Sequence, residues 1–372
     1  MRAGHAHVLI AAASGRALAA SARRGGYRPL VADYFGDQDT LAVADAHQRV
    51  ADGLATGMTR DALLPALEAL ARGRTPIGVV CGSGFEDRPD LLAAIAQRWP
   101  LIGNAPEVIA RIKHPNDFAA LCRTCSIPHP DIAFERPTDP DDWLMKRCGG
   151  AGGLHVAPVA ANTTPPGRYF QRRVPGTPVS AMILADGSHA AVLGFSTQWA
   201  SPTPAQPYRF GGAVAPADIA PATADLLTDA VRRLVAAVPL VGLNSADFLV
   251  ADDRFWLLEI NPRPGATLDI FAPDDRSLFA LHVDACRGVR APELARPTRA
   301  RASAIVYAEQ DIRVGALDWP DWTADRPHAG SVVNAGEPLC TVLATAATPD
   351  EARRLVARRS ETILSSTCAR AA

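Results

Sequence analysis

Apolar and polar positions alternate in two ways along the first 104 residues. Short apolar runs are separated by segments in which apolar side chains recur every three or four residues, as on one face of a helix. The expected strands are Val8–Ala13, Pro29–Asp33, Arg49–Asp52 and Ile77–Cys81, and the expected helices are Leu63–Ala71 and Asp90–Arg98. Such alternation favours a parallel sheet with helices on its faces.

Two loops of small residues follow strands of this sheet, AAASGR at Ala11–Arg16 and CGSGFE at Cys81–Glu86. Ligands usually bind at the carboxyl ends of such strands. Neither loop matches the full dinucleotide-binding fingerprint, so a nicotinamide site is not expected. As plain turn residues these positions would need no function. The candidates for substrate contacts here are Ser14, Gly15, Gly82, Ser83 and Glu86.

A hairpin is predicted over Asp247–Thr267, because two apolar arms flank a short acidic turn at Ala251–Arg254. Side chains two apart on a strand share a face, so Glu259 and Asn261 project together. A register that places Asp247 opposite Glu259 would complete a cluster of oxygen-bearing side chains.

Such a cluster is costly to bury without a cation. A hard divalent cation removes that cost, and Mg²⁺ is expected here, with Mn²⁺ as an alternative. Arg263 would then carry its charge beside the metal. The competing interpretation is an ordinary hairpin with a solvated acidic turn.

Lysine is scarce in this chain. Only two of the 38 basic residues are lysines, Lys113 and Lys146. Lysine carries a compact point charge and arginine a wide planar fork, so the two lysines indicate sites where only the compact donor fits, unless their retention is accidental.

Lys146 lies on a predicted strand that runs into a glycine-rich loop, KRCGGAGGLHV. Glycines allow backbone N–H groups to approach phosphate oxygens closely. The glycines are Gly149, Gly150, Gly152 and Gly153. His155, at the end of the loop, either meets a terminal phosphate or is an ordinary strand histidine.

Further strands are expected over Thr177–Ala185 and His189–Gln198. A loop at Tyr208–Gly212, with Arg209 and Gly211, is a candidate guard of the substrate entrance. Helical spacing of apolar residues predicts an amphipathic helix over residues 222–238.

The last part of the chain is expected to form a smaller closing domain with strands at Ser303–Ala308 and Ser331–Ala344. Thr348 and Glu351 form a capping box with Pro349 at the first helical position, which predicts a helix to about Leu364.

Composition narrows the class of protein. The 372 residues are 48% hydrophobic and 21% charged, which is typical of a globular protein. A net charge of −1 gives no electrostatic footprint for nucleic acid or an anionic membrane. No apolar run approaches the ~20 residues of a membrane span.

The N-terminus resembles a short signal peptide, but Ser14, Gly15 and Arg16 interrupt its apolar segment, so we interpret His7–Ala13 as a buried strand. Seven cysteines do not indicate a disulfide framework. Cys122 and Cys125 lack the second ligand pair of a zinc site and are expected to share a helix face. A cytoplasmic location is expected.

The metal-site residues carry a family resemblance. An acidic residue on one strand, then Glu-x-Asn-x-Arg on the next, resembles the metal-binding signature of ATP-grasp enzymes, and EINPRPGAT is most similar to their predicted carboligase branch, related to biotin carboxylase. The resemblance covers nearly the whole chain. It implies an α/β and α+β protein with a Rossmann-like pre-ATP-grasp domain at 1–104, an ATP-grasp core at 105–298 and a small α+β domain at 299–372.

The resemblance also implies roles for residues. Lys113, followed by a helix and an Ile127-Pro128 turn, matches the first phosphate-contacting lysine, and Lys146 with the glycine loop would contact the phosphates as well. The strand YFQRRVPG is similar to the hinge that holds adenine, which implicates Gln171, Arg172 and Val174. Many relatives have Glu where Arg172 stands, so adenine would depend more on backbone groups here.

The implied activity is ligation of a carboxylate to an amine through an acyl phosphate, with release of ADP and phosphate. Asp247, Glu259 and Asn261 would hold Mg²⁺, and Arg263 would hold the intermediate. Small-molecule acids and amines are the expected partners, in cofactor or amino-acid amide synthesis, including ligation of glutamate to an amine; a homodimer is also considered. The alternatives are a carboxylase acting through carboxyphosphate and a nucleotide-binding regulator without turnover.

Overall fold

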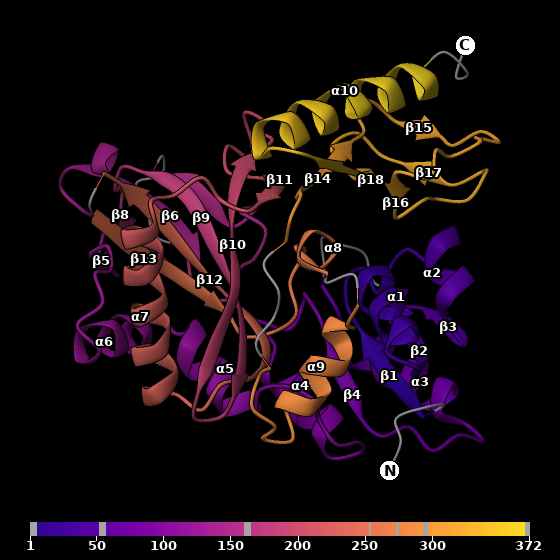
Figure 1. Ribbon diagram of the computed structural model, residues 1–372, viewed down its shortest axis with the longest axis horizontal. Helices are drawn as coiled ribbons and strands as arrows, with labels where there is room; N and C mark the ends of the chain where they lie inside the picture. Colours follow the sequence, from indigo (N-terminus) through magenta and orange to yellow (C-terminus); the bar gives the residue numbers. More distant parts are fainter. Residues whose placement is uncertain are drawn as a thin grey trace.

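A computed structural model describes residues 6–51, 57–159, 165–252, 254–272, 275–292 and 297–368. The N-terminal part is a parallel sheet of order β3-β2-β1-β4 with helices on both faces (Figure 1). Its strands are β1 His7–Ala11, β2 Arg28–Asp33, β3 Ala46–Arg49 and β4 Val79–Cys81, and its helices are α1 Arg16–Arg24, α2 Gln38–Val43, α3 Arg60–Ala71 and α4 Pro89–Ala96. The parallel sheet expected from the alternation of patterns is confirmed.

Two local expectations for this sheet need correction. The third strand is β3, not Arg49–Asp52, because the polar segment AHQR pairs with β2 at the sheet edge, where its side chains are half-buried or exposed. Asp52 lies outside the described residues. Helices α1 and α2 were not expected, because α1 buries mainly small residues and α2 is only six residues long.

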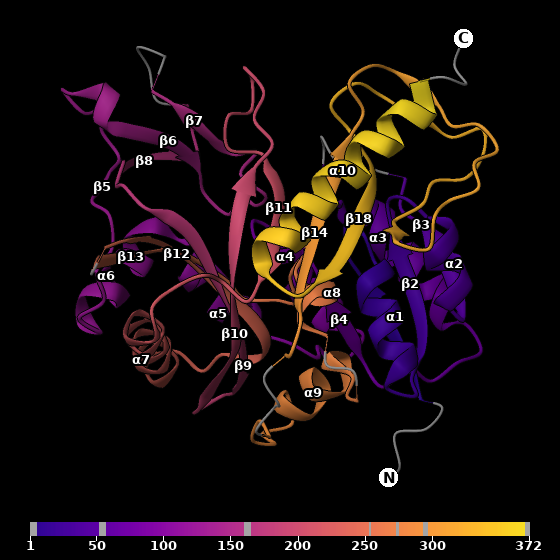
Figure 2. The same cartoon turned by 45° about the horizontal axis from the view of Figure 1, so that its top comes forward.

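A small antiparallel sheet of order β5-β8-β6-β7 stands on the opposite side of the molecule from the N-terminal sheet (Figure 2). Its strands are β5 Ile132–Ala133, β6 Trp143–Arg147, β7 Val156–Pro158 and β8 Arg168–Arg172, with the 3₁₀ helix Pro140–Asp142 before β6. Two helices, α5 Pro106–Lys113 and α6 Pro115–Thr124, connect the N-terminal sheet to this one. The sheet presents Lys146 and the glycine-rich loop between β6 and β7.

The largest sheet has the order β13-β12-β9-β10-β11-β14-β18-β16. Its strands are β9 Thr177–Asp186, β10 Ala190–Ala200, β11 Phe210–Ala215, β12 Val241–Ala251, β13 Arg254–Asn261, β14 Ala300–Tyr307, β16 Thr323–Ala324 and β18 Pro338–Ala346. Helix α7 (Pro221–Ala237) packs on the part of the sheet around β9 and β12 through buried Leu227, Val231 and Leu234. The amphipathic helix expected at 222–238 is therefore confirmed.

The last part of the chain extends this same sheet. Strand β14 pairs with β11 from Gly212↔Ala304 to Ala215↔Arg301, so hydrogen bonds cross the boundary expected at residue 298. Helix α10 (Pro349–Cys368) covers β14 and β18 (Figure 1). Its capping box is confirmed, since Thr348 Oγ1 accepts from the Glu351 N–H at 3.2 Å and Glu351 Oε2 from the Thr348 N–H at 3.3 Å. A separate strand pair, β15 Ile312–Arg313 with β17 Val332–Val333, lies beside it.

The hairpin of β12 and β13 has the expected turn and the expected cross-strand pair. Ala251 pairs with Arg254, and a regular ladder from this turn would set Asp247 opposite Leu258. A β-bulge next to Asp247 shifts the register by one residue, so that Asp247 faces Glu259 instead. The bulge thereby brings the two carboxylates to adjacent positions.

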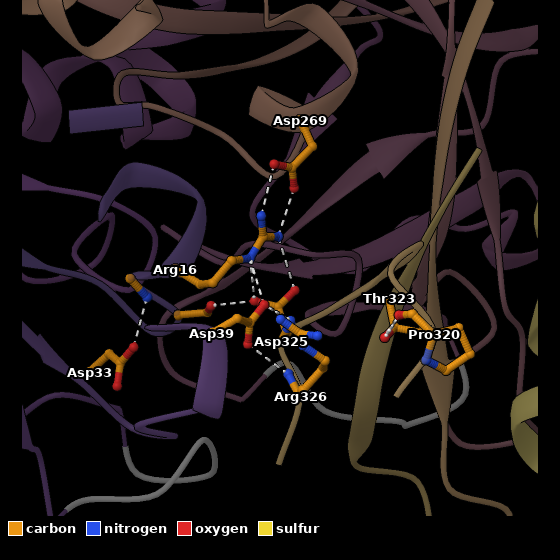
Figure 3. A network of polar contacts seen from close by, with 10 residues as sticks. Arg16, Asp33, Asp39, Asp269, Pro320, Thr323, Asp325 and Arg326 are labelled. Atoms are coloured by element: carbon orange, nitrogen blue, oxygen red, sulfur yellow. Dashed lines mark hydrogen bonds and ion pairs between the residues drawn. The ribbon is translucent and has the colours of Figure 1, made fainter. Parts of the chain in front are cut away.

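Arg16 joins three distant segments of the chain (Figure 3). Its guanidinium donates to both carboxylate oxygens of Asp269, at 2.8 and 2.6 Å, and to both of Asp325, at 3.1 and 3.2 Å. Asp269 lies in the short helix α8 (Leu268–Phe271), and Asp39 accepts from the backbone N–H of Asp325. One arginine thus holds together the N-terminal sheet, α8 and the C-terminal segment, which we define as residues 300–368.

Helix α9 (Leu278–Ala285) completes the described elements and packs its apolar side chains against α1 and β12. Among the described helices, none has the length and apolar character needed to span a bilayer.

Candidate functional site

Three oxygen-bearing side chains of the β12–β13 hairpin lie together. Asp247 Oδ1 accepts from Ser180 Oγ at 2.6 Å, and Asp247 Oδ2 accepts from Asn261 Nδ2 at 2.9 Å. Glu259 stands opposite Asp247 in the ladder, with 29% of its side chain exposed. The hairpin therefore presents two carboxylates and an amide at an opening to solvent.

Lys113 supplies a cation to this cluster. Its Nζ lies 3.2 Å from Glu259 Oε2 and 3.1 Å from Asn261 Oδ1, and its side chain is 7% exposed. Helix α5 ends at Lys113, which places the ammonium over the hairpin. The oxygen donors fit Mg²⁺ by their chemistry, and the ammonium shows that a positive charge is already favourable among them.

The charges around the hairpin shift the pKa values of the two carboxylates in opposite directions. Burial would raise the pKa of Glu259, but Lys113, His155 and Lys146 together hold it at about 2. Burial and the negative charge of Glu259 raise the pKa of Asp247 to about 6, although Ser180 and Lys113 oppose this. Glu259 is thus the carboxylate that stays ionised most firmly.

Lys146 lies on β6 beside the same cluster. It is 7% exposed, and burial lowers its pKa, while the charges of Glu259 and Asp247 oppose the change. Strand β6 pairs with β7 and β8 in the small sheet, so the lysine projects from the middle of a sheet. Lys113 therefore contacts the metal-binding candidates, and Lys146 lies close enough for its charge to interact with theirs.

His155 is the buried histidine of this region. It is 9% exposed, its Nδ1 has no hydrogen-bond partner among the described residues, and burial lowers its pKa to about 4. The ring packs on the loop backbone, because a Cβ at Gly150 would lie 2.1 Å from His155 Cγ. His155 is thus a neutral side chain enclosed by the glycine loop.

The glycine loop, defined as residues 148–155, has a conformation that requires glycine. Gly149, Gly152 and Gly153 have φ values of +68°, +65° and +74°. A Cβ at Gly153 would lie 1.8 Å from the carbonyl oxygen of Tyr208, and one at Gly149 would strike Asp87. Backbone of this kind can approach phosphate oxygens where a side chain would block it.

The expected adenine hinge covers the end of β8 and the residues after it. Gln171 is buried at 2% exposure, whereas Arg172 is exposed and lies 3.8 Å from Asp142. Val174, beyond the strand, is half-buried. Gln171 and Arg172 pair with Leu144 and Trp143, at the end of β6 away from the glycine loop, and their contact with adenine stays a prediction.

Arg263 is held by a residue of the N-terminal domain. Its Nε donates to Glu86 Oε1 at 2.7 Å, and the Glu86 side chain is 3% exposed. Burial would raise the pKa of Glu86, but Arg263, Lys113 and the N–H of Gly84 hold it below its ordinary value. Glu86 and Arg263, two candidates from distant parts of the chain, are therefore direct partners.

Sequence reasoning missed Asn104 and Ser180. Asn104 Nδ2 donates to the carbonyl oxygen of Pro262 at 2.9 Å, and its Oδ1 accepts from the Val241 N–H at 2.8 Å. It thereby ties the segment that carries Arg263 to the start of β12. Neither residue belongs to a motif, so only its place in the fold reveals it.

The other substrate candidates bind protein groups. Ser14 Oγ donates to Asp325 and the Gly15 N–H to Asp33, which assigns both to the surroundings of Arg16. The Ser83 carbonyl accepts from the Ala13 N–H. Arg209 is 5% exposed and bonded to Ser201 and Gly336, and Gly211 packs against Ser201.

Within the described ranges, no group of three or more His, Cys, Asp or Glu side chains could hold a metal ion. Cys122 is buried in α6, and Cys125 is its C-terminal cap.

Glu86 and Arg263 line a cavity of about 20 Å³, which has room for a water molecule rather than a substrate.

Comparison with known proteins identifies a family domain within the chain. The model of the ATP-grasp domain matches residues 118–267. An uncharacterised protein of Methanocaldococcus jannaschii is 24% identical over 115 residues, which are 30% of this chain and 28% of that protein's length.

Solved structures match over almost the whole chain. Biotin carboxylase of Campylobacter jejuni has a TM-score of 0.71 at 14% identity, covering 92% of this chain and 88% of that one. N5-carboxyaminoimidazole synthetase of Staphylococcus aureus has a TM-score of 0.70 at 14% identity, covering 95% and 97%. Pyruvate carboxylase of Rhizobium etli has a TM-score of 0.74 at 15% identity, covering 95% of this chain and 37% of that one. Residues 118–267 therefore match the ATP-grasp domain, and the chain has the fold of the biotin carboxylase and of the synthetase over more than 90% of its length.

Proposed function

We propose that this protein is an ATP-dependent ligase that joins a carboxylate to an amine through an acyl phosphate and releases ADP and phosphate. The observation that carries the proposal is the convergence of Lys113, Glu259 and Asn261 within 3.2 Å, with Lys146 and Asp247 beside them. Two buried lysines and two carboxylates around one opening match a triphosphate with its metal.

Each group has a role in phosphoryl transfer. Lys146, Lys113 and the backbone N–H groups of the glycine loop bind phosphate oxygens. Asp247, Glu259 and Asn261 would hold Mg²⁺, which would neutralise charge that develops on the transferred phosphoryl group. Lys113, which contacts two of these side chains, would bind phosphate oxygens beside the metal.

Arg263 binds the activated acid in this proposal. A guanidinium suits carboxylate and phosphate oxygens, and Glu86 fixes its orientation by taking the Nε–H. Nη1 also donates to the carbonyl oxygen of Pro264 at 3.3 Å, and the Nη side of the guanidinium would face the transferred group as charge develops on it. The incoming amine displaces phosphate from the acyl carbon, so an amide bond forms and the carbon–oxygen bond to phosphate breaks.

The solved structures with this fold support nucleotide use and also favour a second candidate. The biotin carboxylase was solved as a complex with β,γ-ATP, and the Staphylococcus aureus synthetase with ADP. Since the similar proteins include carboxylases, the second candidate is carboxylation through carboxyphosphate. Bicarbonate would then replace the substrate acid in the same pocket.

Product analysis tests the proposal. With purified protein, ATP, Mg²⁺ and a panel of acids that includes glutamate, we expect ADP and phosphate, and hydroxylamine should trap the activated acid as a hydroxamate. AMP and pyrophosphate as products would exclude the acyl phosphate route. ATP cleavage that depends on bicarbonate and on no other acid would favour the carboxylase, and ATP binding without cleavage in any mixture would favour a regulator.

A further inference from the structure

The glycine loop is supported from outside its own sheet. The N–H of Phe210 donates to the carbonyl oxygen of Gly152 at 3.0 Å, and a Cβ at Gly153 would lie 1.8 Å from the carbonyl oxygen of Tyr208. Residues 208–210 therefore lie directly against the loop. The other end of the loop rests on Asp87, which a Cβ at Gly149 would strike.

Residues 208–210 are in turn fixed by the C-terminal segment. The Arg209 guanidinium lies 3.6 Å from the centroid of the Tyr307 ring, and its Nη1 donates to the carbonyl oxygen of Gly336 at 3.2 Å. The Tyr307 hydroxyl donates to the carbonyl oxygen of Phe210 at 2.8 Å. Tyr307 ends strand β14, and Gly336 lies in the turn before β18.

Each nitrogen of the Arg209 guanidinium donates a hydrogen bond in this region. Its Nε donates to the Ser201 carbonyl at 3.0 Å and its Nη2 to Ser201 Oγ at 3.2 Å, and only 5% of the residue is exposed. Stacking on an aromatic ring adds to these hydrogen bonds when the cation is desolvated. Arg209 thus connects β10, β14 and the turn before β18 at the point where the chain reaches the glycine loop.

A loop with four glycines in five positions has high conformational entropy, so its shape depends on contacts with its surroundings. We propose that Arg209 and Tyr307 are positioning residues that hold the glycine loop in its phosphate-binding shape. The C-terminal segment is then part of the nucleotide site without touching the nucleotide. This inference rests on the proposed function only in taking the loop's ligand to be ATP.

Two substitutions separate the contacts. Tyr307→Phe keeps the ring under Arg209 and removes only the hydroxyl that binds Phe210, whereas Arg209→Met removes the guanidinium and keeps the apolar stem. The control is Arg359→Met, because Arg359 also belongs to the C-terminal segment and lies 4.9 Å from the Trp322 ring. Its described hydrogen bond is to the carbonyl oxygen of Leu343, away from the loop.

The readouts are hydrogen exchange of amides 148–156 without nucleotide, the Kd of ATP with Mg²⁺, and the Tm. We expect Tyr307→Phe to speed exchange of the loop and raise the Kd by roughly 2- to 10-fold, the effect of one hydrogen bond. Arg209→Met should act in the same direction and more strongly. Arg359→Met should leave both loop exchange and Kd within about 2-fold of the wild-type values, even if it lowers the Tm as much as the other two substitutions do.

Unchanged loop exchange and Kd in both folded variants would overturn the inference, as would an equal change in Arg359→Met. Failure of the wild-type protein to bind ATP would instead count against the proposed function. Loop exchange, which needs no nucleotide, would still decide whether Arg209 and Tyr307 position the loop.

Discussion

Glu86 and Arg263 lie 177 positions apart in the chain, and their side chains meet at 2.7 Å. Glu86 follows β4 of the N-terminal sheet, and Arg263 follows the hairpin of β12 and β13. The pair thus joins the segment after β4 to the segment after β13. Glu86 also accepts from the N–H groups of Gly84 and Phe85, which fix the carboxylate in place. The fixed carboxylate in turn orients the Arg263 guanidinium.

The first prediction concerns Arg263. Arg263→Ala should lower turnover by about 10²- to 10³-fold, the effect of removing a donor to developing charge. The Kd of ATP should change by less than about 3-fold, because the contact forms mainly in the transition state. Steady-state rates and ATP titration check this. Glu86→Gln should lower turnover less, and unchanged turnover in Arg263→Ala would show the assigned mechanism to be wrong.

The second prediction uses the scarcity of lysine. Lys146→Arg should abolish turnover although it keeps the charge, because the buried position beside the glycine loop has room for an ammonium and not for a guanidinium fork. Turnover and nucleotide affinity of the two proteins are the measurements. Arg147→Lys, at the exposed neighbouring position, is the matched control and should retain activity. Near-normal activity of Lys146→Arg would mean that its retention is accidental.

The third prediction follows from the position of Lys113 between Glu259 and Asn261. The ammonium competes with a divalent cation for the same oxygens, so Lys113→Met should make Mg²⁺ without nucleotide raise the Tm more than in the wild type. Glu259→Gln should instead lose most of the Mg²⁺-dependent part of the Tm increase that ATP produces. Differential scanning fluorimetry with and without EDTA measures both. An increase with ATP that EDTA does not reduce would contradict the metal assignment.

The fourth prediction concerns pH and Asp37. Burial, followed by the charges of Asp325, Asp33 and Asp39, raises its pKa from 3.8 to about 8, against the opposing charge of Arg16. Between these values the folded protein binds a proton that the unfolded chain has released, so stability falls as pH rises.

Asp37→Asn removes this dependence and should melt at a higher temperature than the wild type at pH 8, with a difference that shrinks toward pH 4. Denaturation curves across this range test it, with the exposed Asp61→Asn as control. A difference that is the same at every pH would show that the carboxyl does not titrate in this window.

Part of the fold and site was predictable from sequence because it depends on residues that are near in the chain. The hairpin turn, the shared face of Glu259 and Asn261, and the capping box of α10 each follow from spacing within one or two elements. The pairing of Asp247 with Glu259 was predicted as well, although the bulge that produces it was not.

The structure alone decided which separate elements meet. The contacts of Lys113 with Glu259, of Glu86 with Arg263 and of Arg16 with Asp269 and Asp325 each join residues more than 100 positions apart. The same holds for β14, whose pairing with β11 extends the central sheet into the C-terminal part.

The physical reason is that periodicity reports only which face of an element is buried, not which partner covers it. One amphipathic strand pattern suits many neighbours, so the sequence by itself determined most of the elements and the hairpin. The packing of whole sheets and helices decided that Arg209 contacts the C-terminal segment and that Glu86 binds Arg263. Those contacts exist only once distant surfaces pack together and exclude water.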